Sequence, residues 1–225
     1  MFGGCEIGLT IAIDFTLSNG RPDQPSSLHY LDMQKNEYLN AIRSVGQILQ
    51  YYDTDKQIPV LGFGAAIPPY SQQANHCFAL NGNIFDPEVD GLDGVIEVYK
   101  NAINKVNLYG PTNFSPILRL VNEMTEDLKC SQANQKYSIL LIITDGIISD
   151  LQKTIDEVVY GSSLPLSIII VGVGQAVFGF LSPLYNKLYA AVSQIGFVAP
   201  FTIYKICLLL LLCFLSTLCT FMNSC

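Results

Sequence analysis

The sequence contains no tryptophan and only two histidines, and charged residues make up just 14% of its 225 residues. Lysine and arginine together number 12 against 19 aspartates and glutamates, which gives a net charge of −7. This shortage of positive charge argues against a nucleic-acid partner, which would require a basic surface. It leaves the binding of cations open.

The seven cysteines form no CxxC pair, and they do not gather with His29 and His76 in a zinc-like pattern. Their odd number and wide spacing are typical of a reducing, intracellular compartment. The first residues, MFGGCEIG, lack the basic segment and the cleavage pattern of a secretory signal. We therefore expect a cytoplasmic protein.

Three apolar runs, at 9–13, 138–143 and 166–173, are rich in Ile, Leu and Val and show no period-two alternation. Such runs are typical of strands that are buried on both faces of a parallel sheet. A shorter run at 58–63 and a small one at 76–80 predict two further strands.

Segments with helical periodicity lie between these runs, at 37–52 and 92–106. A third helix is predicted with Ser115 as its N-cap, because Pro116 follows at the first helical position. A fourth is predicted after a capping-box pattern at Ser149 and Gln152. Alternating strands and helices predict an α/β fold with a doubly wound, mostly parallel sheet flanked by helices.

Five oxygen-bearing side chains are predicted in loops at one edge of this sheet, where ligands bind in such folds. Asp14, Thr16 and Ser18 follow the first strand in the pattern D-x-T-x-S, Asp145 follows the run at 138–143, and Thr112 precedes a helix. Taken singly, each aspartate is more often a turn former or a helix cap. Taken together, two carboxylates and three hydroxyls favour a site for a hard cation such as magnesium, manganese or calcium.

The stretches AIDFTLSNG, SLHYLD, QYYDTDKQIPVLGFGA, LYGPTNFSP, YSILLIITDGIISD and LPLSIIIVGVGQA resemble the von Willebrand factor type A domain, in the version found in copines. The resemblance covers residues 7–176. It implies that the same five residues form a metal-ion-dependent adhesion site. In that family the site holds a divalent cation, here expected to be Mg²⁺ with Mn²⁺ or Ca²⁺ as alternatives, and a protein partner supplies an acidic residue to it. The wider family role that it implies is calcium-dependent phospholipid binding and membrane-linked signalling.

Two departures from the family pattern concern the ends of the chain. The lipid-binding modules that precede this domain in copines are not recognised, and an apolar tail at 177–225 replaces the expected last strand and helices. We therefore expect a copine-type domain at 1–176. Within the tail, 199–222 carries a single charge, Lys205, and is long enough to span a membrane. The tail would either anchor the domain at the cytosolic face of the plasma membrane or another membrane, or remain undocked on a non-functional truncated product.

The sequence lacks residues that three other classes of protein require. Phosphatases of the haloacid dehalogenase type need a second aspartate where Thr16 stands, so metal-dependent phosphoryl transfer is kept only as the alternative. A dinucleotide-binding domain would need a glycine-rich turn after the first strand, and a serine hydrolase of the common type a G-x-S-x-G turn. Both are missing, and we expect His29 and His76 to be structural or surface residues. We interpret the protein as a binding module and not as an enzyme.

Overall fold

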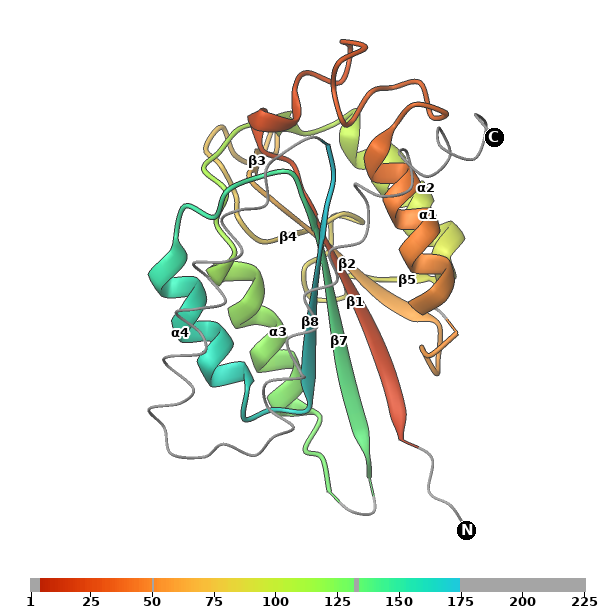
Figure 1. The fold of residues 1–225 in the computed structure, drawn as a ribbon, viewed down its shortest axis with the longest axis vertical. Helices are drawn as coiled ribbons and strands as arrows, with labels where there is room; N and C mark the ends of the chain where they lie inside the picture. Colours follow the sequence, from red (N-terminus) through yellow and green to blue (C-terminus); the bar gives the residue numbers. More distant parts are fainter. Residues whose placement is uncertain (1–4, 50, 132–133, 175–225) are drawn as a thin grey trace, which may run out of the picture.

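The computed structural model describes residues 5–49, 51–131 and 134–174. In this part of the chain a mixed sheet lies between two pairs of helices (Figure 1). The long strands are β1 (Glu6–Asp14), β2 (Gln57–Phe63), β7 (Lys136–Thr144) and β8 (Leu166–Gly172). The short strands are β3 (Ala65–Ala66), β4 (Phe78–Ala79), β5 (Glu88–Asp90) and β6 (Asn107–Leu108). The helices are α1 (Glu37–Leu49), α2 (Gly91–Ile103), α3 (Ser115–Asp127) and α4 (Leu151–Gly161), with a short 3-10 turn at Leu17–Asn19.

The four long strands are parallel, and the order along the main sheet is β4-β2-β1-β7-β8. The short strands β4 and β5 pair with β2 in the antiparallel direction. The predicted α/β fold with a mostly parallel sheet is therefore confirmed. From β1 the chain first adds β2 on one side and later adds β7 on the other side. The carboxyl ends of β1 and β7 thus form the point where the strand order reverses, which is where ligands bind in doubly wound sheets.

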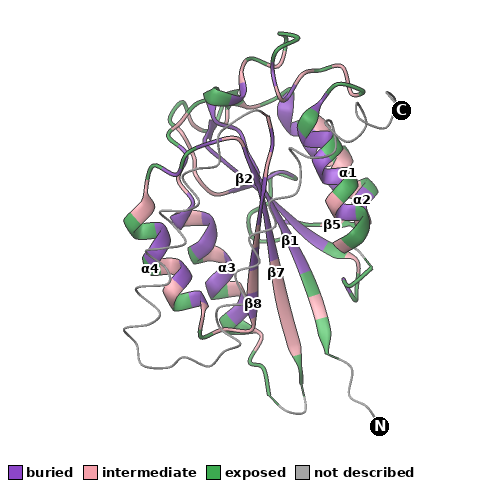
Figure 2. Cartoon of the chain, in the orientation of Figure 1, coloured by how far each residue is buried: buried purple, intermediate pink, exposed green. Residues whose placement is uncertain are grey.

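The two faces of the sheet form two separate cores, and the period of two along each strand decides which side chain enters which core. In β1, Leu9, Ile11 and Ile13 face α1 and α2, whereas Ala12 faces α3 and α4. Figure 2 shows the buried residues concentrated along the central strands and on the sheet-facing sides of the helices. Burial on both faces explains why the strands read as unbroken apolar runs.

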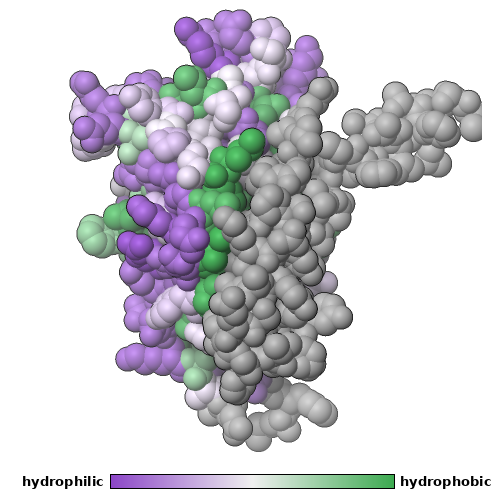
Figure 3. Space-filling view, turned by 60° about the vertical axis from the view of Figure 1, so that its left-hand side comes forward, coloured by the Kyte–Doolittle hydropathy of each residue, from purple (hydrophilic) through white to green (hydrophobic). Residues whose placement is uncertain are grey.

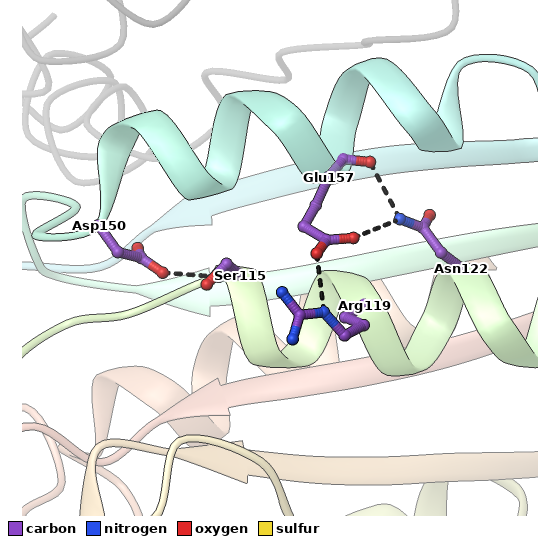
Figure 4. A network of polar contacts seen from close by, with 5 residues as sticks. All are labelled: Ser115, Arg119, Asn122, Asp150 and Glu157. Atoms are coloured by element: carbon purple, nitrogen blue, oxygen red, sulfur yellow. Dashed lines mark hydrogen bonds and ion pairs between the residues drawn. The ribbon is translucent and has the colours of Figure 1, made fainter.

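The starts of α3 and α4 differ by one residue from the prediction. Ser115 is the first residue of α3 and not its N-cap, and Asp150 rather than Ser149 precedes α4. The reason is a contact between the two helix starts, part of which is drawn in Figure 4. The Asp150 carboxylate accepts the backbone N–H groups of Phe114 and Ser115, at 3.0 and 2.9 Å. Burial acts to raise the pKa of Asp150, but these hydrogen bonds outweigh it, and the pKa lies below its usual value.

A second set of polar contacts joins α3 to α4 further along (Figure 4). Arg119 pairs with Glu157 at 2.8 Å, and the Asn122 amide donates to both the backbone oxygen and the carboxylate of Glu157, at 3.0 and 3.2 Å. Arg119 is well exposed, so the ion pair itself contributes little stability. The contacts fix the position of α3, and with it the loop before α3 that carries Thr112.

The predicted tail at 177–225, its candidate membrane segment at 199–222 and the family's last strand and helices lie outside the described residues. Among the helices that the structure describes, none has both the length and the apolar character needed to cross a bilayer.

On the face turned forward in Figure 3, hydrophilic residues cover much of the described surface, and hydrophobic residues gather in a band down the middle of the view.

Candidate metal centre

The two predicted carboxylates lie at the carboxyl ends of neighbouring strands. Asp14 is the last residue of β1 and is fully buried, and Asp145 directly follows β7. Ile13 pairs with Ile143 across the two strands, so both strands end at the same level. The Ser18 hydroxyl donates to Asp145 Oδ1 at 2.9 Å and thereby joins the loop after β1 to the loop after β7.

The three residues of the D-x-T-x-S pattern form one hydrogen-bonded line with Asp145. The Thr16 backbone N–H donates to Asp14 Oδ1 at 2.8 Å, which is the geometry of a turn after an aspartate. The hydroxyls of Thr16 and Ser18 lie 2.9 Å apart and share a hydrogen bond. The structure therefore brings four of the five predicted residues together: Asp14, Thr16, Ser18 and Asp145.

Thr112 lies beside this line, against the residue that follows Asp145. A Cβ atom added at Gly146 would sit 2.7 Å from Thr112 Oγ1, so only glycine leaves room for the threonine there. The Thr112 carbonyl accepts the backbone N–H of Ser149 at 2.8 Å. Gly64 acts in the same way on the other side, because its positive φ of 80° and its lack of a side chain make room for Thr16. Two glycines thus hold two hydroxyl residues close to the carboxylates.

The electrostatics of the site disfavour its carboxylates in their ionised form. Burial raises the pKa of Asp14 to about 6, hydrogen bonds from Thr144 and Thr16 act to lower it, and the charge of Asp145 raises it further. Burial also raises the pKa of Asp145, against the hydrogen bond from Ser18. A divalent cation between the two loops would offset both effects, because it favours the charged form of each carboxyl group.

Several residues that support the site were missed by the sequence analysis. The Thr144 hydroxyl donates to Asp14 Oδ2. The Asn19 amide donates to the Thr16 carbonyl at 3.0 Å and accepts the Tyr38 hydroxyl at 2.6 Å. For Thr144 the sequence offered one signal of a role in the site, namely its position directly before Asp145. For Tyr38, which comes from a helix, it offered none.

His29 is a fully buried support of the site. Its Nε2 donates to the Asp14 carbonyl at 2.8 Å, and its Nδ1 lies 2.8 Å from the Tyr99 hydroxyl. The ring stacks between Phe15 and Tyr38, with centroid distances of 5.2 and 4.0 Å. Complete burial lowers the pKa of His29 to about 3, so the ring is neutral at neutral pH. The expectation of a structural histidine is confirmed for this residue.

The donor set suits a hard divalent cation. The described residues contain no group of three or more His, Cys, Asp or Glu side chains that could hold a metal. The candidate site offers two carboxylates and three hydroxyls instead, all of them oxygen donors. Oxygen donors without nitrogen or sulfur fit Mg²⁺, Mn²⁺ or Ca²⁺ rather than zinc or copper.

Two kinds of comparison place the chain among known proteins. In fold it is similar to a crystal structure of the manganese-loaded TRAP protein of Plasmodium vivax, with a TM-score of 0.50 and 11% identity over 84% of this chain and 72% of that one. The N-terminal domain of TFIIH p34 matches with a TM-score of 0.45 and 14% identity, over 80% of this chain and 86% of that one. At such low identity the likeness to TRAP shows only a shared fold, that of von Willebrand factor type A domains.

The sequence itself carries the family assignment. The Copine family profile matches residues 27–199, which is well over half of the chain. Copine and von Willebrand factor type A domains generally serve as interaction modules. The resemblance predicted from the sequence is therefore confirmed: the chain belongs to the copine family.

Proposed function

We propose that this copine-family chain is a metal-dependent protein-interaction module. Asp14, Thr16, Ser18, Thr112 and Asp145 would hold one divalent cation, with Mg²⁺ as the expected ion and Mn²⁺ or Ca²⁺ as alternatives. The observation that carries the proposal is the hydrogen-bonded line from Asp14 through Thr16 and Ser18 to Asp145. It gathers oxygen donors from two loops at the point where the strand order reverses.

The partner would be a protein that presents an acidic side chain. The site has only two carboxylates of its own, and both are already hydrogen-bonded to protein groups. A cation held largely through hydroxyls and water would keep an affinity for one more anionic oxygen. An aspartate or glutamate of the partner would supply it, so binding would require the metal and would be reversed by a chelator.

Phosphoryl transfer is the alternative, and two contacts count against it. Asp14 would have to be the nucleophile, yet it is fully buried and both of its carboxylate oxygens accept hydrogen bonds. Thr16, which stands where the second aspartate would be required, uses its hydroxyl in the contact with Ser18. Turnover of an aryl phosphate by the purified protein, with loss of that turnover in Asp14→Asn, would favour the enzyme.

The test of the proposed function is a magnesium titration. We expect Mg²⁺ to raise the melting temperature of the chain relative to EDTA, because a ligand that binds only the folded state stabilises it by mass action. Asp14→Ala and Asp145→Ala should each remove this increase. Asp156→Ala, which removes an exposed carboxylate on α4, is the control and should keep it. If both site variants keep the full increase, the proposed site is wrong.

Membrane-linked signalling is the wider role that family membership suggests, and we propose that the domain recruits its protein partner at the cytosolic face of a membrane. Residues 199–222 would supply the attachment, with Lys205 near the cytosolic end. Leu211→Lys should then prevent attachment, because a charge at the centre of a span costs about 2.5–3.5 kcal/mol on insertion scales. Recovery of the unchanged chain in the soluble fraction after carbonate extraction of membranes would exclude this attachment.

A further inference from the structure

Three large apolar side chains are exposed around the candidate metal centre. Leu17, which lies between Thr16 and Ser18, is 57% exposed, and Ile147, two residues after Asp145, is 68% exposed. Tyr109 is 56% exposed, and its carbonyl accepts the backbone N–H of Leu17 at 2.6 Å. Apolar side chains therefore flank the hydroxyls and carboxylates from the loops after β1, β6 and β7.

A groove on the surface shares Leu17 with this set of exposed apolar side chains. Its volume is about 470 Å³, and Leu17 forms part of its wall. Leu31, Val106 and Leu108 supply further apolar surface, and all three are partly exposed there. The charged residues of the groove, Arg21 and Asp23, pair with each other at 3.1 Å and so present little net charge to a ligand.

The groove and the metal centre share one loop, because Leu17 lines the groove while Thr16 and Ser18, its two neighbours, belong to the centre. A partner segment whose carboxylate binds the metal would therefore have its neighbouring side chains close to Leu17. An exposed apolar surface next to a polar centre is typical of a surface that is covered on binding. A carboxylate alone would not discriminate between partners, whereas an apolar side chain in the groove would.

We propose that the groove takes a large apolar side chain from the same partner segment whose acidic residue completes the metal centre. The partner is thus a protein with an acidic residue that has a large aliphatic or aromatic neighbour. This inference rests on the proposed function for the role of the metal. The groove adds the selectivity, because burial of one leucine side chain favours binding by a factor of about ten or more.

The experiment uses the full chain with three fluorescein-labelled glycine–serine peptides that differ only at their centres. The centres are Leu-Asp-Leu, Ser-Asp-Ser and Leu-Asn-Leu, and binding is measured by fluorescence anisotropy in Mg²⁺ and in EDTA. In Mg²⁺ we expect the Leu-Asp-Leu peptide to bind about tenfold more tightly than the Ser-Asp-Ser peptide. The Leu-Asn-Leu peptide lacks the carboxylate, so even in Mg²⁺ it should bind no better than the two aspartate peptides bind in EDTA.

The variant that tests the groove is Leu17→Ser, and its matched control is Ile48→Ser. Ile48 lies on α1 and is 61% exposed, close to the 57% of Leu17, so both substitutions remove a similar apolar surface. We expect Leu17→Ser to weaken Leu-Asp-Leu to the level of Ser-Asp-Ser, while the magnesium-induced increase in melting temperature persists. Ile48→Ser should leave the peptide preference unchanged.

The outcomes separate the groove from the metal. Equal binding of the Leu-Asp-Leu and Ser-Asp-Ser peptides would overturn the proposed role of the groove, and so would an equal loss of affinity for Leu-Asp-Leu in Leu17→Ser and Ile48→Ser. In either case a preserved magnesium response would leave the proposed function intact. Self-association of the chain that is lost in Leu17→Ser, without peptide binding, would assign the groove to a second copy and overturn the proposal. Absence of any magnesium response would instead refute the proposed function itself.

Discussion

Replacement of Asp14 by asparagine should have opposite effects on stability in EDTA and in magnesium. The Asp14 carboxyl group is fully buried, and burial raises its pKa from 3.8 to about 6. A group whose pKa is higher in the folded state favours folding most below its unfolded pKa, and this contribution is lost as the pH rises through the folded pKa. At pH 7 without metal, the buried charge therefore works against folding.

The size of this effect follows from the pKa. One pKa unit corresponds to about 1.4 kcal/mol, so a pKa near 6 implies a penalty of about 3 kcal/mol at neutral pH as an upper value. Asparagine has nearly the same shape and carries no charge, and its oxygen can still accept the Thr16 N–H. We expect Asp14→Asn to unfold several degrees above the unchanged chain in EDTA, since about 1 kcal/mol corresponds to 2–4 °C in a domain of this size.

The assay is a thermal melt of both proteins at a series of pH values, in EDTA and in saturating Mg²⁺. In EDTA the advantage of the variant should grow between about pH 4 and 6 and then level off. In Mg²⁺ the order should reverse, because at about 1,000 times the Kd a cation adds about 4.1 kcal/mol to the unchanged chain alone, which exceeds the penalty of about 3 kcal/mol. A variant that melts below the unchanged chain in EDTA would refute the reasoning, because the carboxylate would then be stabilised by its hydrogen bonds rather than opposed by burial.

Three further predictions test the supports of the site. His29 is buried and neutral, and its pKa of about 3 lies below the unfolded value of 6.5. The unfolding free energy of the unchanged chain should therefore fall by about 2 kcal/mol between neutral pH and about pH 5. Urea melts of His29→Gln should lack this pH-dependent loss. Gly146→Ala should displace Thr112 and weaken Mg²⁺ binding in calorimetry, whereas Gly8→Ala, where an added Cβ meets nothing within 4 Å, should not. Asp150→Ala should lower the unfolding free energy by about 1–2 kcal/mol in urea melts, since it removes the acceptor for two N–H groups at the start of α3; an unchanged midpoint would contradict that role.

The long strands and the D-x-T-x-S segment of the candidate site were predictable because both depend on short-range patterns. β1, β7 and β8 are buried on both faces or close to it, so their apolar character is continuous in the sequence. The D-x-T-x-S pattern lies directly after β1, and its contacts join residues only two positions apart. Once the strand was placed, the side chains at its end were placed with it.

The short strand β4 lies within the run at 76–80 that predicts a strand. The other short strands, β3, β5 and β6, could not be predicted, because they exist only through their partners. Glu88–Asp90 has no apolar run, and it is a strand because it pairs with the start of β2 from Gln57 to Pro59. Ala65–Ala66 likewise forms a strand through its pairing with Asn107 and Leu108. Segments of two or three residues carry too few side chains for a periodicity to appear.

The supports of the site were out of reach for a related reason. His29 and Tyr99 are 70 residues apart in the sequence, yet they share a hydrogen bond beneath Asp14. The capping-box pattern at Ser149 was a sound local signal, but Asp150 instead contacts a helix start 35 residues away. Such contacts follow from the packing of the whole domain, and no local pattern reports them.

The measurement that tests the central claim most directly is the anomalous X-ray signal of crystals grown with Mn²⁺. Manganese suits the same oxygen donors as magnesium and scatters strongly enough to be located on its own. The account predicts a strong anomalous peak at the carboxyl ends of β1 and β7, next to Asp14, Thr16, Ser18, Thr112 and Asp145, and its loss in Asp145→Ala. A fully occupied manganese ion bound elsewhere in the domain, or a peak here that Asp145→Ala retains unchanged, would contradict it.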